Sequence, residues 1–400
     1  TWDFNGDDID DSGDDNEATS GWGAKYYTTV TSGSTYATMT IQVDPVDNLS
    51  ARSGNPNLYH EAANIDSNKS ILAITMKNST LNNRIQIKVN NNSDHISNFD
   101  NVGTSEQDFS TYYIDLSSNS GWSGMIEQIQ LTFKEVGGAK AFPGNIDIDE
   151  IQFLAAIPSR FSSNTTIPDQ IALESIKIDS GVLLTLNSTG GLAATGALVN
   201  EGNITLQSTS INSATLIADS TSGSGTYRYE KYTSTTSTND LISSPFAGET
   251  FSSLLSNNSG VIYTNPSDAT QYLFGPFNNV TSSYETYDSD TDNSQTIDPG
   301  KGYRAASASG GAIAFTGSFL TTDHTQGITA ESGAYGSWNL VGNPFPSYLD
   351  AAHFRTDNNG RFAENFEAIY AYDGDVSDGW LIIDANNASS YKIAPGQAFL

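Results

Sequence analysis

The chain has 400 residues, with 46 acidic and 17 basic side chains and a formal net charge of −29. This length predicts two or three separate cores, and the strong negative charge argues against nucleic acid and anionic lipid as partners. Cysteine is absent, which excludes disulfides and thiol chemistry, and no apolar run is long enough to predict insertion into a membrane.

An acidic stretch follows the first predicted strand, Trp2-Asp3-Phe4. Seven carboxylates lie between Asp7 and Glu17. Like charges at this density repel each other unless water solvates them or a cation neutralises them. Calcium is the candidate cation, since it takes about six to eight oxygen ligands from flexible loops. Asp147 or Asp149, on the last strand of this section, is expected to complete such a site. A solvated acidic loop is the alternative interpretation.

Alternating apolar residues predict further strands over 36–43, 70–78 and 83–91. Two more half-buried strands follow, one along Ile126 to Phe133 with a slip of phase that a bulge would absorb, and a closing strand over 145–154. The polar loop 137–144 between them predicts an antiparallel pair at the edge of a β-sandwich.

Several aromatic residues of this section lie outside clear strand centres, namely Trp22, Tyr26, Tyr27, Tyr59 and Trp122. Aromatic rings offer flat apolar faces that stack on the C–H face of a sugar, while neighbouring Asn and Asp side chains bond the hydroxyls. Trp22, Tyr26, Tyr59 and Trp122 are therefore candidate ligand-binding residues. The alternative is that Trp22 and Trp122 plug the ends of the sandwich.

The order of the strings "TWDFN", "SILAITMKNST", "YYIDLSSNSGWSGMIEQIQLTF" and "GNIDIDEIQFL" resembles jelly-roll modules of the galactose-binding-like class. Such modules occur in surface proteins and polysaccharide-degrading enzymes of bacteria that use type IX secretion. The resemblance implies a carbohydrate-binding-like jelly roll over 1–158. It also implies a structural calcium held by Asp3, Asp149 and Asp7.

Proline and Ser/Asn/Thr-rich residues then predict a linker, and residues 159–226 carry very short apolar pulses such as "IKI", "LLTL" and "NITL". Pulses separated by Gly or Asn-Glu-Gly turns are typical of the rungs of a β-solenoid, each rung packing on the next. The prediction is a short solenoid-like connector, with an ordinary β-meander as the alternative.

Short strands with Gly/Pro turns over 227–400 predict a second β-sandwich, so the whole chain is expected to be all-β. The strings "LISSP", "GKGY", "WNLVGNPFPSYLD" and "IYAYDG" resemble the β-domain that precedes the sorting domain of type IX cargo. The resemblance implies export through the type IX translocon. Two departures are Asn239-Asp240 before "LISSP" and the absence of a sorting domain before Leu400.

No catalytic residues are predicted. The four histidines, at 60, 95, 324 and 353, form no metal-ligand pair, and neither an HExxH, a G-x-S-x-G nor a phosphate-binding loop occurs. The string "DIDE" at Asp147–Glu150 resembles the carboxylate strand of jelly-roll glucanases. A retaining glycosidase needs two carboxyl groups about 5 Å apart, but the flanking acidic residues of those enzymes are missing.

The string "DST" at Asp219 to Thr221 resembles an O-glycosylation signal of the same bacteria, with Ser220 as acceptor. The chain opens at Thr1 without an apolar leader, as a mature exported protein does after signal cleavage, or as a shortened chain does. The sequence thus favours an extracellular, non-catalytic surface protein or adhesin that binds polysaccharide. The alternatives are a calcium-stabilised structural passenger and an accessory region of a polysaccharide hydrolase.

Overall fold

The computed structural model describes residues 9–10, 22–25, 28–32, 36–41, 57–100, 102–137, 144–236, 239–364, 366–372 and 379–400. Within these ranges the chain is built of strands, with short helices α1 (Phe251–Asn257) and α2 (Ala351–Asp357) and the 3-10 turn η1 (Ala388–Ser390). The all-β prediction is confirmed. None of these described helices is long enough to cross a bilayer.

The chain divides into two compact units. Unit 1 comprises Thr1–Pro158 with Ser163–Pro168, and unit 2 comprises Ser159–Ser162 with Asp169–Leu400. The solenoid-like residues and the C-terminal section therefore pack together in unit 2.

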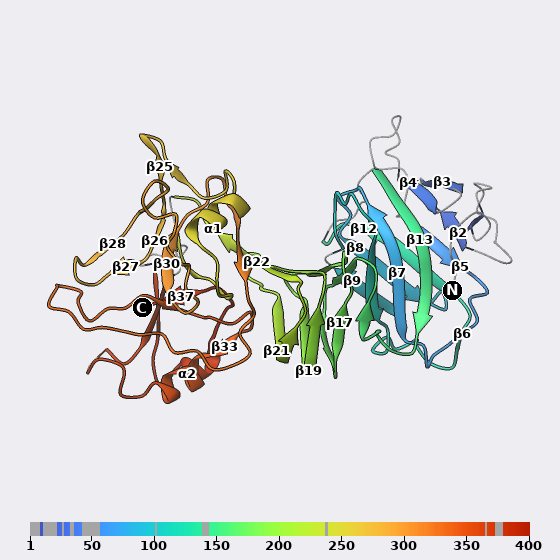
Figure 1. Ribbon diagram of the computed structural model, residues 1–400. Coiled ribbons are helices and arrows are strands. Elements are labelled where there is room, and N and C mark those ends of the chain that lie inside the picture. The colour runs from blue at the N-terminus through green and yellow to red at the C-terminus, as the bar shows by residue number, and fades with distance from the viewer. Residues whose placement is uncertain are drawn as a thin grey trace. The chain divides into compact units, whose positions relative to one another are not determined.

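Unit 1 contains two main sheets and a small strand pair (Figure 1). The first sheet is ordered β1 (Ile9–Asp10), β2 (Trp22–Lys25), β5 (Asn57–His60), β12 (Ile129–Lys134), β8 (Arg84–Val89) and β9 (Ile96–Asp100). The second is ordered β3 (Thr28–Ser32), β4 (Ala37–Ile41), β13 (Gly144–Leu154), β7 (Ile71–Asn78), β10 (Ser110–Asp115) and β15 (Thr165–Ile167). The pair is β6 (Ile65–Asp66) with β11 (Met125–Ile126).

One apolar core joins the two sheets of unit 1. Strand β8 buries every second residue, and Ile85, Ile87 and Val89 share one cluster with Leu72 and Ile74 of β7. Alternation of period two sends these side chains to one face of each strand, and burial of each contributes roughly 1.5–3 kcal/mol. The alternating pattern in the sequence therefore encodes this core.

The expected pairing of the last two strands of unit 1 is wrong. Strand β12 lies between β5 and β8, whereas β13 lies between β4 and β7 in the other sheet. Each strand is central in its own sheet, so both of its edges are already paired. The phase slip is also not a bulge within one strand, because the segment divides into β11 and β12, which pair in different sheets.

The solenoid-like region of unit 2 is built of parallel strands, as the short apolar pulses predict. Strand β19 pairs with β16, β17 and β21, β17 pairs with β14, and β18, β20 and β22 pair in series. The bounds are β14 (Arg160–Phe161), β16 (Gln170–Leu173), β17 (Ile176–Ile178), β18 (Leu183–Leu186), β19 (Gly191–Asn200), β20 (Asn203–Gln207), β21 (Thr215–Ser222) and β22 (Thr226–Thr233). Its interior is aliphatic, with Ile178, Leu184, Leu198 and Ile204 fully buried.

The rest of unit 2 consists of small antiparallel sheets (Figure 1). Several apolar clusters form its core. Strand β22 continues into it by pairing with β31 (Gly311–Gly317). Two sheets have three strands each: β23 (Asp240–Ser243), β30 (Gly302–Ala305) and β26 (Phe274–Gly275) form one, and β24 (Thr264–Asn265), β25 (Asp268–Tyr272) and β29 (Tyr287–Asp288) form the other. A four-stranded sheet is ordered β32 (Val341–Gly342), β37 (Ala398–Phe399), β34 (Ile369–Tyr372) and β35 (Trp380–Ile383). Two strand pairs complete the set, β27 (Phe277–Asn278) with β28 (Ser283–Tyr284) and β33 (Leu349–Asp350) with β36 (Lys392–Ile393).

Candidate functional site

Three of the four aromatic residues predicted to bind a ligand in unit 1 are buried. Trp22 is fully buried with its ring edge-on to His60 at 5.5 Å, and Tyr59 is only 6% exposed. Trp122 stacks on Phe153 and donates its Nε1–H to the Ser67 carbonyl at 3.1 Å. Buried rings offer no open face to a sugar, so the structure gives these three residues a packing role. Tyr26 lies outside the described residues.

The predicted calcium ligands fall mostly outside the described residues, which include neither Asp3 nor Asp7. Asp149 is partly exposed at the register shift of β13. The neighbouring Asp147 is buried, forms a 2.9 Å ion pair with Lys77 and accepts a hydrogen bond from Thr38. Among the described residues no cluster of three or more His, Asp or Glu side chains is arranged to hold a metal. The calcium site stays a prediction.

The predicted glycosylation residue lies at the surface. Ser220 is exposed on β21, where its backbone pairs with Ala197 of β19. Exposure leaves the hydroxyl accessible, and modification of Ser220 stays a prediction.

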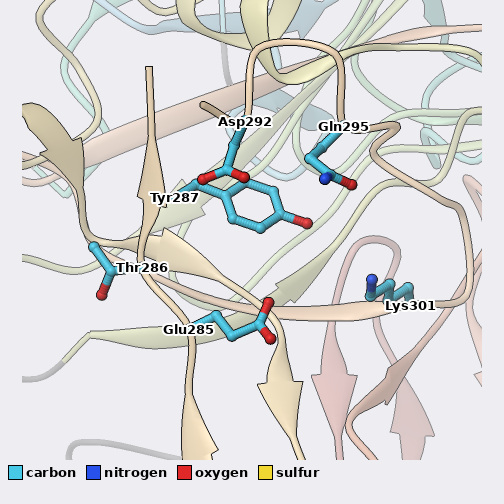
Figure 2. A pocket seen from close by; sticks show the side chains of 6 residues that line it. All are labelled: Glu285, Thr286, Tyr287, Asp292, Gln295 and Lys301. Atoms are coloured by element: carbon cyan, nitrogen blue, oxygen red, sulfur yellow. The ribbon is translucent and has the colours of Figure 1, made fainter. Parts of the chain in front are cut away.

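A polar pocket of about 400 Å³ lies in unit 2. Figure 2 shows its six lining residues, Glu285, Thr286, Tyr287, Asp292, Gln295 and Lys301. Burial raises the pKa of Tyr287 to about 12, and the carboxylates of Glu285 and Asp292 add to the rise. Both carboxylates hold loops in place, since Glu285 accepts a hydrogen bond from Asn278 and Asp292 accepts one from the backbone of Asp288. The geometry gives these two acids a structural role.

A group of partly exposed aromatic side chains gathers elsewhere on unit 2. We call it the aromatic face and define it as Tyr284, Trp338, Phe366, Tyr370, Tyr372 and Trp380. None of these residues is among the ligand-binding residues predicted from the sequence.

The hairpin of β34 and β35 is the centre of the aromatic face. Tyr370 is paired with Ile382, and Tyr372 with Trp380, so all four side chains share one face of the hairpin. The opposite face packs into a core that contains Ile369, Ala371 and Ile383. Ile382 is 51% exposed, so this face is open to solvent at that position, whereas Tyr372 and Trp380 also pack against an apolar cluster.

Contacts between rings join five members of the aromatic face into two groups. The rings of Tyr372 and Trp380 are 5.3 Å apart, and those of Tyr370 and Trp338 are 4.8 Å apart. Phe366, which is 55% exposed, extends the group at 6.2 Å from Trp338. These are edge-to-face geometries that hold rings at fixed angles.

The inner side of the aromatic face rests on a small apolar cluster. Tyr284, Tyr372 and Trp380 pack against Leu241 and Leu340 while they remain only partly buried. Rings fixed in this way lose little further side-chain entropy when a ligand binds, which favours binding through their open sides. The arrangement can present flat apolar surface to a partner but supplies no acid or nucleophile from its rings.

One signal in the sequence points to this face. The string "IYAY" alternates aliphatic and aromatic residues at period two, which indicates a strand with aromatic residues on one side. The contribution of Trp338, Phe366 and Tyr284 depends on tertiary packing of distant segments, which no local pattern reports.

Comparisons with known proteins give one family match. Residues 150–378 match a family described as "Domain of unknown function (DUF8693)", and no curated protein matches the chain. Among solved structures, the glycoside hydrolase domain of Endo-D from Streptococcus pneumoniae R6 aligns over 38% of this chain and 24% of that one. The identity is 11% and the TM-score is 0.24, so the alignment carries no argument about fold or activity. Because the matched residues span more than half of its length, the chain belongs to the DUF8693 family.

Proposed function

We propose that this chain is a non-catalytic extracellular protein or adhesin of the cell surface that binds polysaccharide. The aromatic face of unit 2 supports the binding role. The resemblance of residues 227–400 to type IX cargo supports export by that route. The proposal includes a jelly roll in the N-terminal section and a β-sandwich in the C-terminal one.

The aromatic face is the observation that carries the proposal. Apolar ring surface left open to water is costly, and a concentration of partly exposed rings on one surface marks a binding site. Tyr370 and Tyr372 are held on strand β34, and the ring of Trp338, from a loop, lies 4.8 Å from that of Tyr370. Sugars in a chain present their apolar C–H faces at comparable intervals, so several residues of one polysaccharide can stack along this surface.

The charge of the chain fits an extracellular role. Its formal net charge of −29 keeps copies apart and opposes adsorption to anionic lipid and nucleic acid. Attraction to a sugar polymer through ring stacking does not require opposite net charge, because it relies on apolar contact at short range.

A glycan microarray probed with the intact chain tests the proposal. Trp338→Ala and Tyr370→Ala are each expected to weaken binding by about 5- to 10-fold, for the polysaccharides that the wild type binds on the array. The reason is that one stacking ring contributes about 1 kcal/mol. Tyr232→Ala is the matched control, because Tyr232 is an exposed tyrosine of β22 in the same unit but outside the aromatic face.

Two outcomes would contradict the proposal. One is a wild-type chain that retains no polysaccharide on the array. The other is a loss of binding that is the same in Tyr232→Ala as in Trp338→Ala. Thermal unfolding of each variant separates a loss of the binding surface from a loss of the fold.

A further inference from the structure

An arginine lies within the aromatic face. Arg304 is on β30, opposite Leu241 of β23 and Gly275 of β26. Its guanidinium carbon is 4.7 Å from the centre of the Tyr284 ring, which is a cation–π contact. Burial raises the pKa of the Tyr284 hydroxyl, and the charge of Arg304 opposes that rise. Arg304 and Tyr284 are therefore close enough to act on one ligand.

The charge of Arg304 has no acidic partner in the described part of the chain. No ion pair or hydrogen bond to its guanidinium is formed there, and its buried Nε atom is without a hydrogen-bond partner. This is unusual in a protein with 46 acidic and 17 basic side chains, where a cation has many possible partners. By contrast, Arg84 and Arg160 each form an ion pair with an aspartate.

A guanidinium beside partly exposed aromatic rings matches a particular class of sugar. The planar fork of an arginine binds a carboxylate through two parallel N–H···O bonds, which a single ammonium cannot do. In a uronic acid the carboxylate is attached to the sugar ring, so stacking of that ring on the aromatic face brings the carboxylate near a neighbouring cation.

We infer that Arg304 selects polysaccharides that carry carboxylate groups, with the sugar ring stacked on the aromatic face and the carboxylate bound by the guanidinium. This inference rests on the proposed binding of polysaccharide and adds the class of sugar. The contact acts at short range, whereas the repulsion between the other charges of the acidic chain and an acidic polymer is largely screened beyond about 8 Å at physiological ionic strength.

The test compares two polymers that differ only at the carboxylate. Polygalacturonate and its fully methyl-esterified form are titrated into the intact wild-type chain, Arg304→Gln and Arg304→Lys at about 0.15 M salt. The wild type is expected to bind polygalacturonate about tenfold more tightly than the ester, since a charged hydrogen-bonded pair contributes on that order. Arg304→Gln is expected to lose the preference, and Arg304→Lys to keep only part of it.

The controls separate this inference from the proposed function. Lys392→Gln removes an equal charge from an exposed side chain on β36 and is expected to keep the preference. Equal binding of ester and acid by the wild type, or an unchanged preference in Arg304→Gln, would overturn the inference and leave polysaccharide binding standing. If the wild type binds neither polygalacturonate nor its ester, the inference about Arg304 is overturned as well. If the wild type binds nothing on the whole glycan panel, both this inference and the proposed function are overturned.

Discussion

A partly buried carboxyl group in unit 1 shows how single residues set the stability of the scaffold. Glu106 accepts hydrogen bonds from the hydroxyl of Tyr112 at 2.6 Å and from the backbone of Asn78 at 2.9 Å. Burial is the main influence on its pKa and raises it above the usual glutamate value of 4.5, while these two hydrogen bonds oppose the rise. The folded chain therefore keeps this proton to a higher pH than the unfolded chain.

The shift fixes the direction of a pH effect. The contribution of Glu106 to stability is greatest below the unfolded-state pKa and is lost as pH rises through the folded-state pKa. Glu106→Gln removes this titration. The melting temperature of the variant, relative to that of the wild type, is therefore expected to increase as pH rises from about 4.5 toward neutrality. Scanning calorimetry across this range measures the difference, with the exposed Glu127→Gln as control. Parallel curves for wild type and Glu106→Gln would contradict the assignment.

At the scale of an element, the solenoid-like region depends on a glycine at a position where backbone segments pack closely. Gly202 lies in the turn between β19 and β20, and an added Cβ would lie 2.4 Å from the Val182 carbonyl oxygen and 2.6 Å from that of Asp179. Stacked turns bring backbone against backbone, so only a residue without a side chain fits. Gly202→Ala is expected to destabilise unit 2 by about 1–3 kcal/mol, measured by urea unfolding. Gly327→Ala, with open space around its Cβ, is expected to change nothing, and equal effects would contradict this packing.

The elements that the sequence predicts well are those with a local signature. The alternation in β7 and β8 and the short pulses of the solenoid-like region are readable because each strand buries its own apolar residues. The pairing partners of β12 and β13 could not be predicted from the sequence. Strands that follow each other across a polar loop can belong to different sheets, as these two do. Helix α1 was also missed, since its buried residues Phe251 and Leu254 occupy less than two turns.

The candidate site depends on contacts between elements. Tyr370 and Tyr372 are two residues apart in one strand, but Trp338 approaches Tyr370 from a separate loop and Tyr284 comes from another hairpin. The burial of Trp22 and Trp122 is likewise a property of the assembled core. Aromatic residues outside strand centres in the sequence were therefore a poor guide to which rings are exposed.

For the molecule as a whole, the proposed calcium site remains a prediction about unit 1. If Asp149 holds calcium together with the acidic loop, added calcium raises the melting temperature of the intact chain and a chelator lowers it. Asp149→Asn is expected to remove most of that shift. Asp94→Asn, which changes an exposed aspartate of the same unit, is expected to keep it. A wild-type chain that ignores calcium would contradict the site.

We propose that this acidic, all-β chain contacts polysaccharide through the aromatic face of unit 2. Hydroxyl-radical footprinting of the intact chain, with and without a polysaccharide that it retains on the array, tests this most directly. Protection is expected at Trp338, Phe366 and Tyr370, with Tyr232 unchanged. Protection confined to residues outside the aromatic face, with Trp338, Phe366 and Tyr370 oxidised as in the free protein, would contradict it.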